Sequence, residues 1–372
     1  MKHFFSHQSS AIILGIETSC DETAAAVVRN STEVLSSVIR SSANIHALYG
    51  GVVPEIASRC HVEAIGAVVR EAVEKSGVDW PALDAVAVTH GPGLASSLVV
   101  GLSAAKGLAV SLGKPLVGVN HLEGHLFSVF LGKPREVFEA AFPMMGLVVS
   151  GGHTCWVEMP EPHTYKVVGQ TLDDAAGEAF DKAAKLLGLG YPGGPLMEKA
   201  ANAAPPGWEK ILFPQGRIQP GNRLLGGLDP ALCASFSGLK TSLMYRLKEH
   251  RHSCLCSVEN HRQECLCSVN ALAAAYQEAI VGVLVERCAI ALKNKKWRGL
   301  AIGGGVSLNS RLRVALRDTC HNAGVELLLA EPKYCGDNAA MIAGLAGVGG
   351  GVDAGMDLDV EPGLKIGLMA KG

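Results

Sequence analysis

The sequence lacks an excess of charge of either sign. Its 33 lysine and arginine residues nearly balance 35 aspartate and glutamate residues, and the formal net charge at pH 7 is -2. A chain with so little net charge has no overall attraction to nucleic acid, so an RNA partner needs a local basic patch or a helper protein. Only 18% of the residues are charged and 48% are hydrophobic, which excludes a disordered chain.

Export and membrane signals are also missing. The first ten residues, MKHFFSHQSS, are too short and too weakly apolar for a secretory signal, and we expect the longest apolar runs to fall short of a membrane span. The 11 cysteines, an odd number, indicate reduced thiols and not a disulfide framework. We therefore expect a soluble protein with no membrane association in the cytoplasm, with the mitochondrial matrix as the alternative.

Two familiar enzyme motifs are absent. The sequence contains no G-x-x-x-x-G-K-[ST], which excludes a P-loop enzyme. Residues 121–125 read HLEGH and resemble the zinc-protease pattern H-E-x-x-H, but Leu122 occupies the position of its general base. Glu123 lies about 200° around a helix from that face and is expected to point away from a shared metal.

The order of apolar runs predicts an α/β fold. The segment AIILGIETSCDETAAAVVR indicates strand, turn and strand, and MMGLVVSGGHTCWVEM repeats this design. Strands alternating with helices follow each hairpin, which is typical of parallel sheets covered on both faces. We expect two similar lobes around a cleft: an N-terminal lobe of residues 10–132 plus about 336–372, and a C-terminal lobe of residues 140–335.

One stretch interrupts this order. In HSCLCSVENHRQECLCSVN the pentapeptide CLCSV begins at Cys254 and again at Cys265. The cysteines and histidines could suggest zinc, but C-x-C lacks the usual knuckle spacing. We favour a local duplication that lengthens a surface loop at about 250–269, because long insertions change stability little.

A metal site is indicated by His121 and His125, which lie one helical turn apart on the same face. Asp337, in YCGDNAAM, is the candidate third ligand. Two imidazoles and one carboxylate suit Fe²⁺ or Zn²⁺ and leave positions open for substrate. The alternatives are a pair of packed or solvated histidines and an aspartate that serves as a helix N-cap.

Three glycine-rich turns follow predicted strands. They are THGPGLASS, VVSGGHT and AIGGGVSLNS. Such turns expose backbone N–H groups that bind anions, and three at one cleft favour a nucleotide or an adenylate. Taken singly, each is equally explained as a tight turn that only glycine tolerates.

Many motifs in one order resemble the TsaD family of tRNA N6-threonylcarbamoyladenosine synthases. They span residues 12 to 348 and include GIETSCDETAAAVV, HALYGGVVPEIASRCH, HGPGLASSLVVGLSAAKGLA, NHLEGH, LVVSGGHT, DDAAGEAFDKAAKLLGLGYPGGP, FSGLKTS, GGGVSLNSRLR and YCGDNAAMIAG. The resemblance implies the two-lobe fold of the actin, Hsp70 and sugar-kinase (ASKHA) superfamily. It also implies transfer of a threonylcarbamoyl group from threonylcarbamoyl-AMP to N6 of the adenosine 3′ of the anticodon, in tRNAs that read codons beginning with A.

The resemblance also implies roles for individual residues and partners. The metal ligands are His121, His125 and Asp337, and the adenylate is held by Val148, Val149, Ser150, Gly151, Gly152, Asp181, Gly194 and Asn309. Glu198 stands where relatives carry an aspartate near the ribose. The implied partners are tRNA with TsaB-like and TsaE-like proteins in a bacterium, or a second copy of the chain in mitochondria.

Glu17, Asp21 and His153 are the candidates for accepting the proton that N6 loses. Each has an alternative as a hydrogen-bond partner that stabilises a turn. Because a fold does not fix a function, two other hypotheses stay open: an ATP-dependent kinase or ATPase of the same fold, and a non-catalytic scaffold in a tRNA-modifying assembly.

Overall fold

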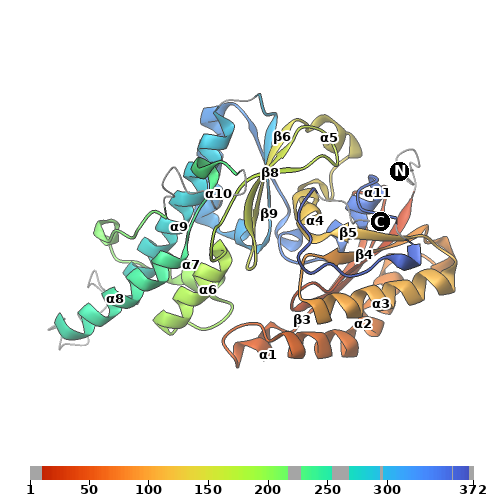
Figure 1. The fold of residues 1–372 in the computed structure, drawn as a ribbon, viewed down its shortest axis with the longest axis horizontal. Coiled ribbons are helices and arrows are strands. Elements are labelled where there is room, and N and C mark those ends of the chain that lie inside the picture. Colours follow the sequence, from red (N-terminus) through yellow and green to blue (C-terminus); the bar gives the residue numbers. More distant parts are fainter. Residues whose placement is uncertain (1–10, 217–227, 254–267, 294–295, 354, 368–372) are drawn as a thin grey trace.

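Each half of the chain folds around a five-stranded sheet, and the two sheets have the same topology (Figure 1). The strand order is β3-β2-β1-β4-β5 in the first sheet and β8-β7-β6-β9-β10 in the second. In both sheets the first three strands form antiparallel hairpins, and the last two strands run parallel to the central one. The predicted pair of related hairpins and the two similar lobes are therefore confirmed.

The computed structural model describes residues 11–216, 228–253, 268–293, 296–353 and 355–367. The strands are β1 (Ile12–Glu17), β2 (Glu22–Arg29), β3 (Glu33–Ser41), β4 (Ala85–Gly91), β5 (Leu116–Asn120), β6 (Met144–Val149), β7 (Thr154–Met159), β8 (Lys166–Gln170), β9 (Gly299–Gly303) and β10 (Glu326–Leu329). The α-helices are α1 (Ala43–Ala47), α2 (Pro54–Ser76), α3 (Ala95–Leu112), α4 (His121–Phe127), α5 (Arg135–Ala140), α6 (Ala176–Leu187), α7 (Gly193–Asn202), α8 (Ser237–Ser253), α9 (Val269–Leu292), α10 (Ser310–Ala323) and α11 (Ala339–Gly347). The duplicated CLCSV segment lies largely outside the described residues.

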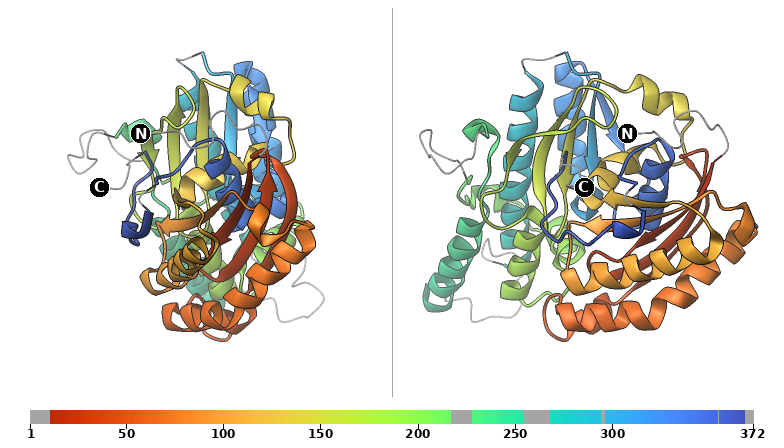
Figure 2. Two further views of the ribbon diagram at one scale, coloured as in Figure 1. Left: turned by 90° about the vertical axis from the view of Figure 1, so that its right-hand side faces the viewer. Right: turned by 45° about the vertical axis from the view of Figure 1, so that its right-hand side comes forward.

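Helices cover both faces of the first sheet. α2 and α3 lie on one face, and α11 packs on the other although it comes from the far end of the chain (Figures 1 and 2). The side chains of β1 alternate accordingly: Ile13 packs in the cluster that contains α11, whereas Leu14 and Ile16 pack in the cluster under α2 and α3. The last helix, α11, returns to the first lobe. This brings the residues just before α11 close to the end of β1.

The helix α4 lies where the two lobes meet. It directly follows β5 of the first sheet, and its backbone touches β9 of the second sheet: a Cβ added to Gly303 would lie 2.2 Å from the carbonyl oxygen of His125. The next residue, Leu126, fills the space left by the missing side chain of Gly146 in β6. The position of α4, and with it that of His121 and His125, is consequently fixed relative to both sheets.

Two helix starts differ from the sequence pattern. A helix is expected from Ser307, but residues Gly305–Leu308 form a 3₁₀ turn and α10 begins at Ser310. A helix is expected from about residue 337, but α11 begins at Ala339. In both cases the side chain of an asparagine, Asn309 or Asn338, accepts a backbone N–H three residues on and sets the first turn.

Among the residues that the structure describes, two helices satisfy the length and composition of a membrane span, namely α3 and α9. The expectation that every apolar run falls short of a span is therefore wrong for these two segments. Within the molecule, 61% of the apolar window of α9 and 33% of that of α3 are buried, because both helices pack against the sheets. Length and composition alone are weak evidence for a span, since core helices pass the same test.

The contact between β1 and α11 predicts how one added methyl group changes stability. A Cβ on Gly15 would lie 2.3 Å from the carbonyl oxygen of Ala339, so Gly15→Ala should lower the free energy of unfolding by about 1–3 kcal/mol through overpacking. Gly66 is a matched control: it is exposed in α2 with no neighbour near an added Cβ, and Gly66→Ala should raise stability by about 0.4–1 kcal/mol. Urea unfolding of both variants measures the difference, and equal midpoints would contradict the packing.

Candidate active site

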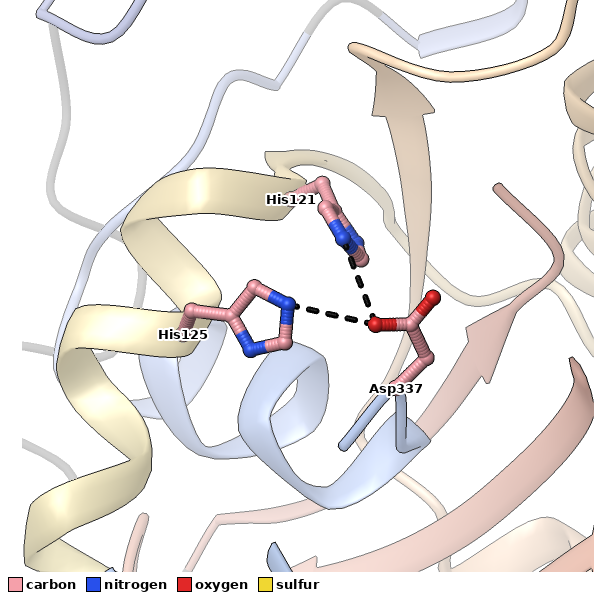
Figure 3. A group of neighbouring side chains, drawn as sticks. All are labelled: His121, His125 and Asp337. Atoms are coloured by element: carbon pink, nitrogen blue, oxygen red, sulfur yellow. Dashed lines mark ion pairs between the residues drawn. The ribbon is translucent and has the colours of Figure 1, made fainter. Parts of the chain in front are cut away.

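His121, His125 and Asp337 converge at the junction of the lobes (Figure 3). The ligand atoms that they offer all lie within 4.8 Å of one another. One carboxylate oxygen of Asp337 lies 3.5 Å from Nε2 of His121 and 3.2 Å from Nε2 of His125. The predicted grouping of these three residues is therefore present in the structure.

The local sequence explains why the two imidazoles share a face. Asn120 caps α4, since its side-chain oxygen accepts the N–H groups of Leu122 and Glu123. Within this seven-residue helix the rings of His121 and His125 stand edge to face, with their centroids 4.5 Å apart. Glu123 points away, as expected, and its carboxylate accepts the N–H of Gly367.

Asp337 is not a helix cap. Asn338 performs that role for α11, and its amide also donates to the carbonyl oxygens of Tyr334 and Gly336. These bonds fix the backbone just before α11 and leave the carboxylate of Asp337 directed at the histidines (Figure 3). The alternative interpretation of Asp337 as an N-cap is therefore wrong.

Glu17, a predicted proton acceptor, does not line the cleft. It is fully buried at the end of β1, and its carboxylate lies 3.0 Å from Nδ1 of His121. Thr89 and the backbone of Ser19 also donate to this carboxylate. A carboxylate that accepts Nδ1–H of a histidine leaves Nε2 as the lone-pair donor, which is the arrangement of metal-bound histidines. The geometry thus makes Glu17 a positioning residue for His121.

The buried charges around His121 depend on one another. Burial alone would lower its pKa, but the negative charges of Glu17 and Asp337 outweigh burial and raise the pKa of His121 to about 9. Burial would likewise raise the pKa of Asp337, but the positive charge of His121 lowers it. The pKa of His125 is lowered by burial and then by the charge of His121. In the metal-free protein a proton on His121 therefore separates two carboxylates.

The residues fit a bound metal ion. His125 is fully buried, and neither of its ring nitrogens makes a hydrogen bond of acceptable geometry within the described part of the chain. Its Nε2 nevertheless lies close to Asp337, so a shared ion accounts for the approach better than a hydrogen bond does. Two neutral imidazoles and a carboxylate suit Fe²⁺ or Zn²⁺.

A cavity of about 1140 Å³ adjoins this group. Of the residues predicted from sequence, it is lined by Asp21, His121, Ser150, Gly151, Gly152, His153, Asp181 and Asp337. The turns of the two related hairpins thus face one another across one cleft. Burial, together with the charges of His121 and His125, lowers the pKa of His153 to about 4, so its imidazole is neutral at pH 7.

Several predicted donor-binding residues do not line the cavity. Val148 and Val149 are fully buried in β6, with their side chains in hydrophobic clusters. Gly194 lies at the start of α7, next to Gly193, whose N–H binds the carboxylate of Asp181. Of the predicted donor-binding residues, those that line the cavity are Ser150, Gly151 and Gly152 in the turn that follows β6, together with Asp181.

Asn309 and Glu198 are held by protein partners. The amide oxygen of Asn309 accepts the N–H of Leu312, and its nitrogen donates to the side-chain oxygen of Gln277. Glu198 accepts the N–H and the hydroxyl of Ser310 at the start of α10. In this structure both residues fix the first turn of α10, and the neighbouring Gly305 lines the cavity instead.

The site residues expected from the sequence include no lysine, although three lysines lie on the cavity wall and two of them belong to the motif DDAAGEAFDKAAKLLGLGYPGGP. Lys182 and Lys185 from α6 and Lys240 from α8 line the cavity. Lys182 pairs with Asp174 at 2.6 Å, while Lys240 belongs to the FSGLKTS motif. That motif was the one signal that could have identified Lys240.

Comparisons with known proteins point to one family. A family model described as TsaD, tRNA N6-adenosine threonylcarbamoyltransferase, matches residues 33–344. Proteins named tRNA N6-adenosine threonylcarbamoyltransferase are similar to the chain: that of Trichlorobacter lovleyi is 46% identical over 89% of the chain and 90% of the relative, and that of Symbiobacterium thermophilum is 46% identical over 97% and 98%. The crystal structure of HypF from T. kodakarensis matches 92% of the chain and 48% of its own length, with a TM-score of 0.56 at 13% identity. This last likeness concerns the fold alone, and the predicted α/β fold with two similar lobes is confirmed.

Because Glu17 contacts His121 but is not one of the three ligand residues, replacing Glu17 should lower the affinity for metal while all three ligands stay in place. Glu17→Gln should weaken binding roughly 10–100-fold, because partners that orient a ligating histidine typically contribute this much. Glu123→Gln is the matched control, since Glu123 lies between the two histidines in sequence but faces Gly367. Competition with a zinc-binding dye measures both affinities, and equal values for the two variants would contradict the positioning role.

Proposed function

The chain belongs to the TsaD family of tRNA N6-adenosine threonylcarbamoyltransferases, and from this premise we propose how its cleft performs the transfer. The protein transfers a threonylcarbamoyl group to N6 of an adenosine in tRNA. We propose that the donor is threonylcarbamoyl-AMP and that the acceptor is the adenosine 3′ of the anticodon in tRNAs that read codons beginning with A. The observation that carries this proposal is one cavity that joins a glycine turn to the His121, His125 and Asp337 group.

The turn after β6 suits the phosphate of the donor. An added Cβ on Gly151 or Gly152 would meet nothing within 4 Å, so their backbone faces open space in the cavity. The turn is nevertheless fixed, because the N–H of Ser150 donates to the carbonyl oxygen of His153 and its own carbonyl oxygen accepts the N–H of Gly177. A rigid, bare backbone turn is a common binding site for phosphate.

We propose that His121, His125 and Asp337 hold one Fe²⁺ or Zn²⁺ ion. When bound, such an ion supplies Lewis acidity at the carbamoyl oxygen. No metal hydroxide is needed, since the donor is already an activated mixed anhydride, and this agrees with Leu122 at the position of a protease base. Glu17, through His121, fixes the site against the first sheet.

The chain's own contribution to the reaction is positioning and proton transfer. The lone pair of adenine N6 is delocalised into the ring, so holding it against the carbamoyl carbon supplies much of the rate. As the new N–C bond forms and AMP departs, N6 becomes cationic and its proton is strongly acidic. Of the three predicted proton acceptors, Asp21 and His153 line the cavity. A neutral imidazole suffices to take this proton, even with a lowered pKa.

We further propose where and with what the protein works. Slight net negative charge argues that the chain alone binds tRNA weakly. A TsaB-like and a TsaE-like protein would assist it in a bacterium, and a second copy would do so in mitochondria. The relatives reported above are bacterial, which supports the first arrangement and a cytoplasmic location.

His153 and Asp21 can be told apart by kinetics. If His153 takes the proton, His153→Ala should lower kcat by about 10²–10⁴-fold, whereas Asp21→Asn should act chiefly on KM for the donor. Because the pKa of His153 is lowered to about 4, it stays unprotonated and the rate should show no inflection near the ordinary histidine value of about 6.5. Stopped-time assays between about pH 5 and 8 measure this, and a rate that falls on acidification through pH 6.5 would contradict the assignment.

The reaction itself is tested with threonine, bicarbonate, ATP, an adenylate-forming synthase, the partner proteins and unmodified tRNA. Mass spectrometry of the digested tRNA should detect N6-threonylcarbamoyladenosine with the wild-type chain. Asp337→Asn should remove most of the product while the protein stays folded, because the change deletes a charged ligand and no buried apolar contact. ATP consumption with a phosphorylated small molecule, and no modified nucleoside, would instead support a kinase of this fold.

A further inference from the structure

The turn between α1 and α2 displays apolar side chains at the mouth of the cavity. The exposed fractions of Leu48 and Tyr49 are 83% and 58%. The next residues, Gly50 and Gly51, line the cavity itself. Both side chains are therefore accessible to a ligand that enters the cavity.

This turn is a built feature of the first lobe. His46 is fully buried, and its carbonyl oxygen accepts the N–H groups of Tyr49 and Gly51, at 3.0 and 3.3 Å. Gly50 has a φ of 70°, which favours glycine and turns the chain sharply after Tyr49. The backbone that carries Tyr49 is therefore fixed beside the cavity.

A cation from the second lobe reaches the same point. Lys185 is exposed on the last turn of α6 and lines the cavity, and a Cβ added to Gly50 would lie 2.9 Å from its Nζ. Helices α1 and α6 indeed face one another across the two lobes (Figure 1). At one rim of the cavity the ammonium group of Lys185, from the second lobe, thus lies beside Gly50, the residue that follows Tyr49 in the first lobe.

A nucleotide in an RNA loop matches this pair. To bring N6 into the cavity, the target adenosine must leave its stack, so a neighbouring nucleotide remains at the rim with an uncovered base. Aromatic side chains bind such bases by stacking, and lysines bind the adjoining phosphate. Gly50 and Gly51 make the wall continuous from the cavity to Tyr49.

We propose that Tyr49 and Lys185 form a clamp that grips the nucleotide next to the target adenosine, with the Tyr49 ring stacked on its base and the Lys185 ammonium on its phosphate. The clamp is a positioning element for the RNA and takes no part in the proton transfer. It rests on the proposed function, since it needs the target adenosine to enter this cavity.

Kinetics of the complete, partner-containing system test the clamp. Tyr49→Ala should raise KM for tRNA about tenfold, since stacking on an aromatic side chain is worth roughly 1–3 kcal/mol per base, while kcat changes less than about twofold. Tyr49→Phe should keep KM within about twofold of wild type, because it keeps the ring. Lys185→Ala should reduce the slope of log affinity against log salt by about one. Affinity for a non-hydrolysable adenylate analogue should be the same in Tyr49→Ala and Tyr49→Phe as in the wild type.

The control is Tyr245→Ala, because Tyr245 is 59% exposed on α8 and does not line the cavity. An unchanged KM for tRNA in Tyr49→Ala would overturn the clamp. So would an equal rise in Tyr245→Ala, or full recovery of Tyr49→Ala by excess partner protein, which would assign this surface to protein docking. A wild-type chain that makes no modified nucleoside would overturn the proposed function itself, and the clamp with it.

Discussion

The contact of His121 with two carboxylates is the constraint on which the rest of the site depends. Glu17 comes from the end of the first strand, His121 from the start of α4, and Asp337 from the residues before α11. These three points meet because the chain returns from the second lobe to the first, where α11 packs on β1. Since α4 also touches β9, the same contact fixes the ligand face relative to both lobes. The charges then decide protonation, because two buried carboxylates favour a cation between them.

Much of this arrangement could be predicted from the sequence. The paired hairpins follow from two apolar runs around small-residue turns, and the shared face of His121 and His125 follows from helical spacing. Two features could not be predicted. Nothing in ETSCDET, residues 17–23, shows that Glu17 turns inward while Asp21 faces the cleft, because that depends on contacts such as the one with Thr89 in a neighbouring strand. A pattern also cannot say which of two adjacent residues caps a helix, and here Asn338 caps α11 while Asp337 is left for the histidines.

The cleft has two unlike walls. The first lobe contributes carboxylates, and the second contributes three lysines, the carboxylates of Glu178 and Asp181, and the bare glycine turn after β6. This division suits two substrates that arrive separately: an adenylate whose phosphate needs backbone donors, and an RNA loop whose backbone needs cations at the rim. The slight negative net charge of the whole chain does not exclude RNA, because lysines of the second lobe lie on the cavity wall. Asn309 and Glu198 do not line the cavity, and they contribute indirectly by fixing the first turn of α10.

The central claim is that His121, His125 and Asp337 together hold a metal ion. X-ray absorption fine structure of the zinc-loaded protein tests it most directly. The account predicts a first shell of nitrogen and oxygen at about 2.0–2.1 Å, with the outer-shell scattering of two imidazoles, and loss of one imidazole in His125→Ala. A sulfur scatterer at about 2.3 Å would contradict the account, because it would assign the ion to a cysteine such as Cys20 on the cavity wall. An unchanged spectrum in His125→Ala would contradict it equally.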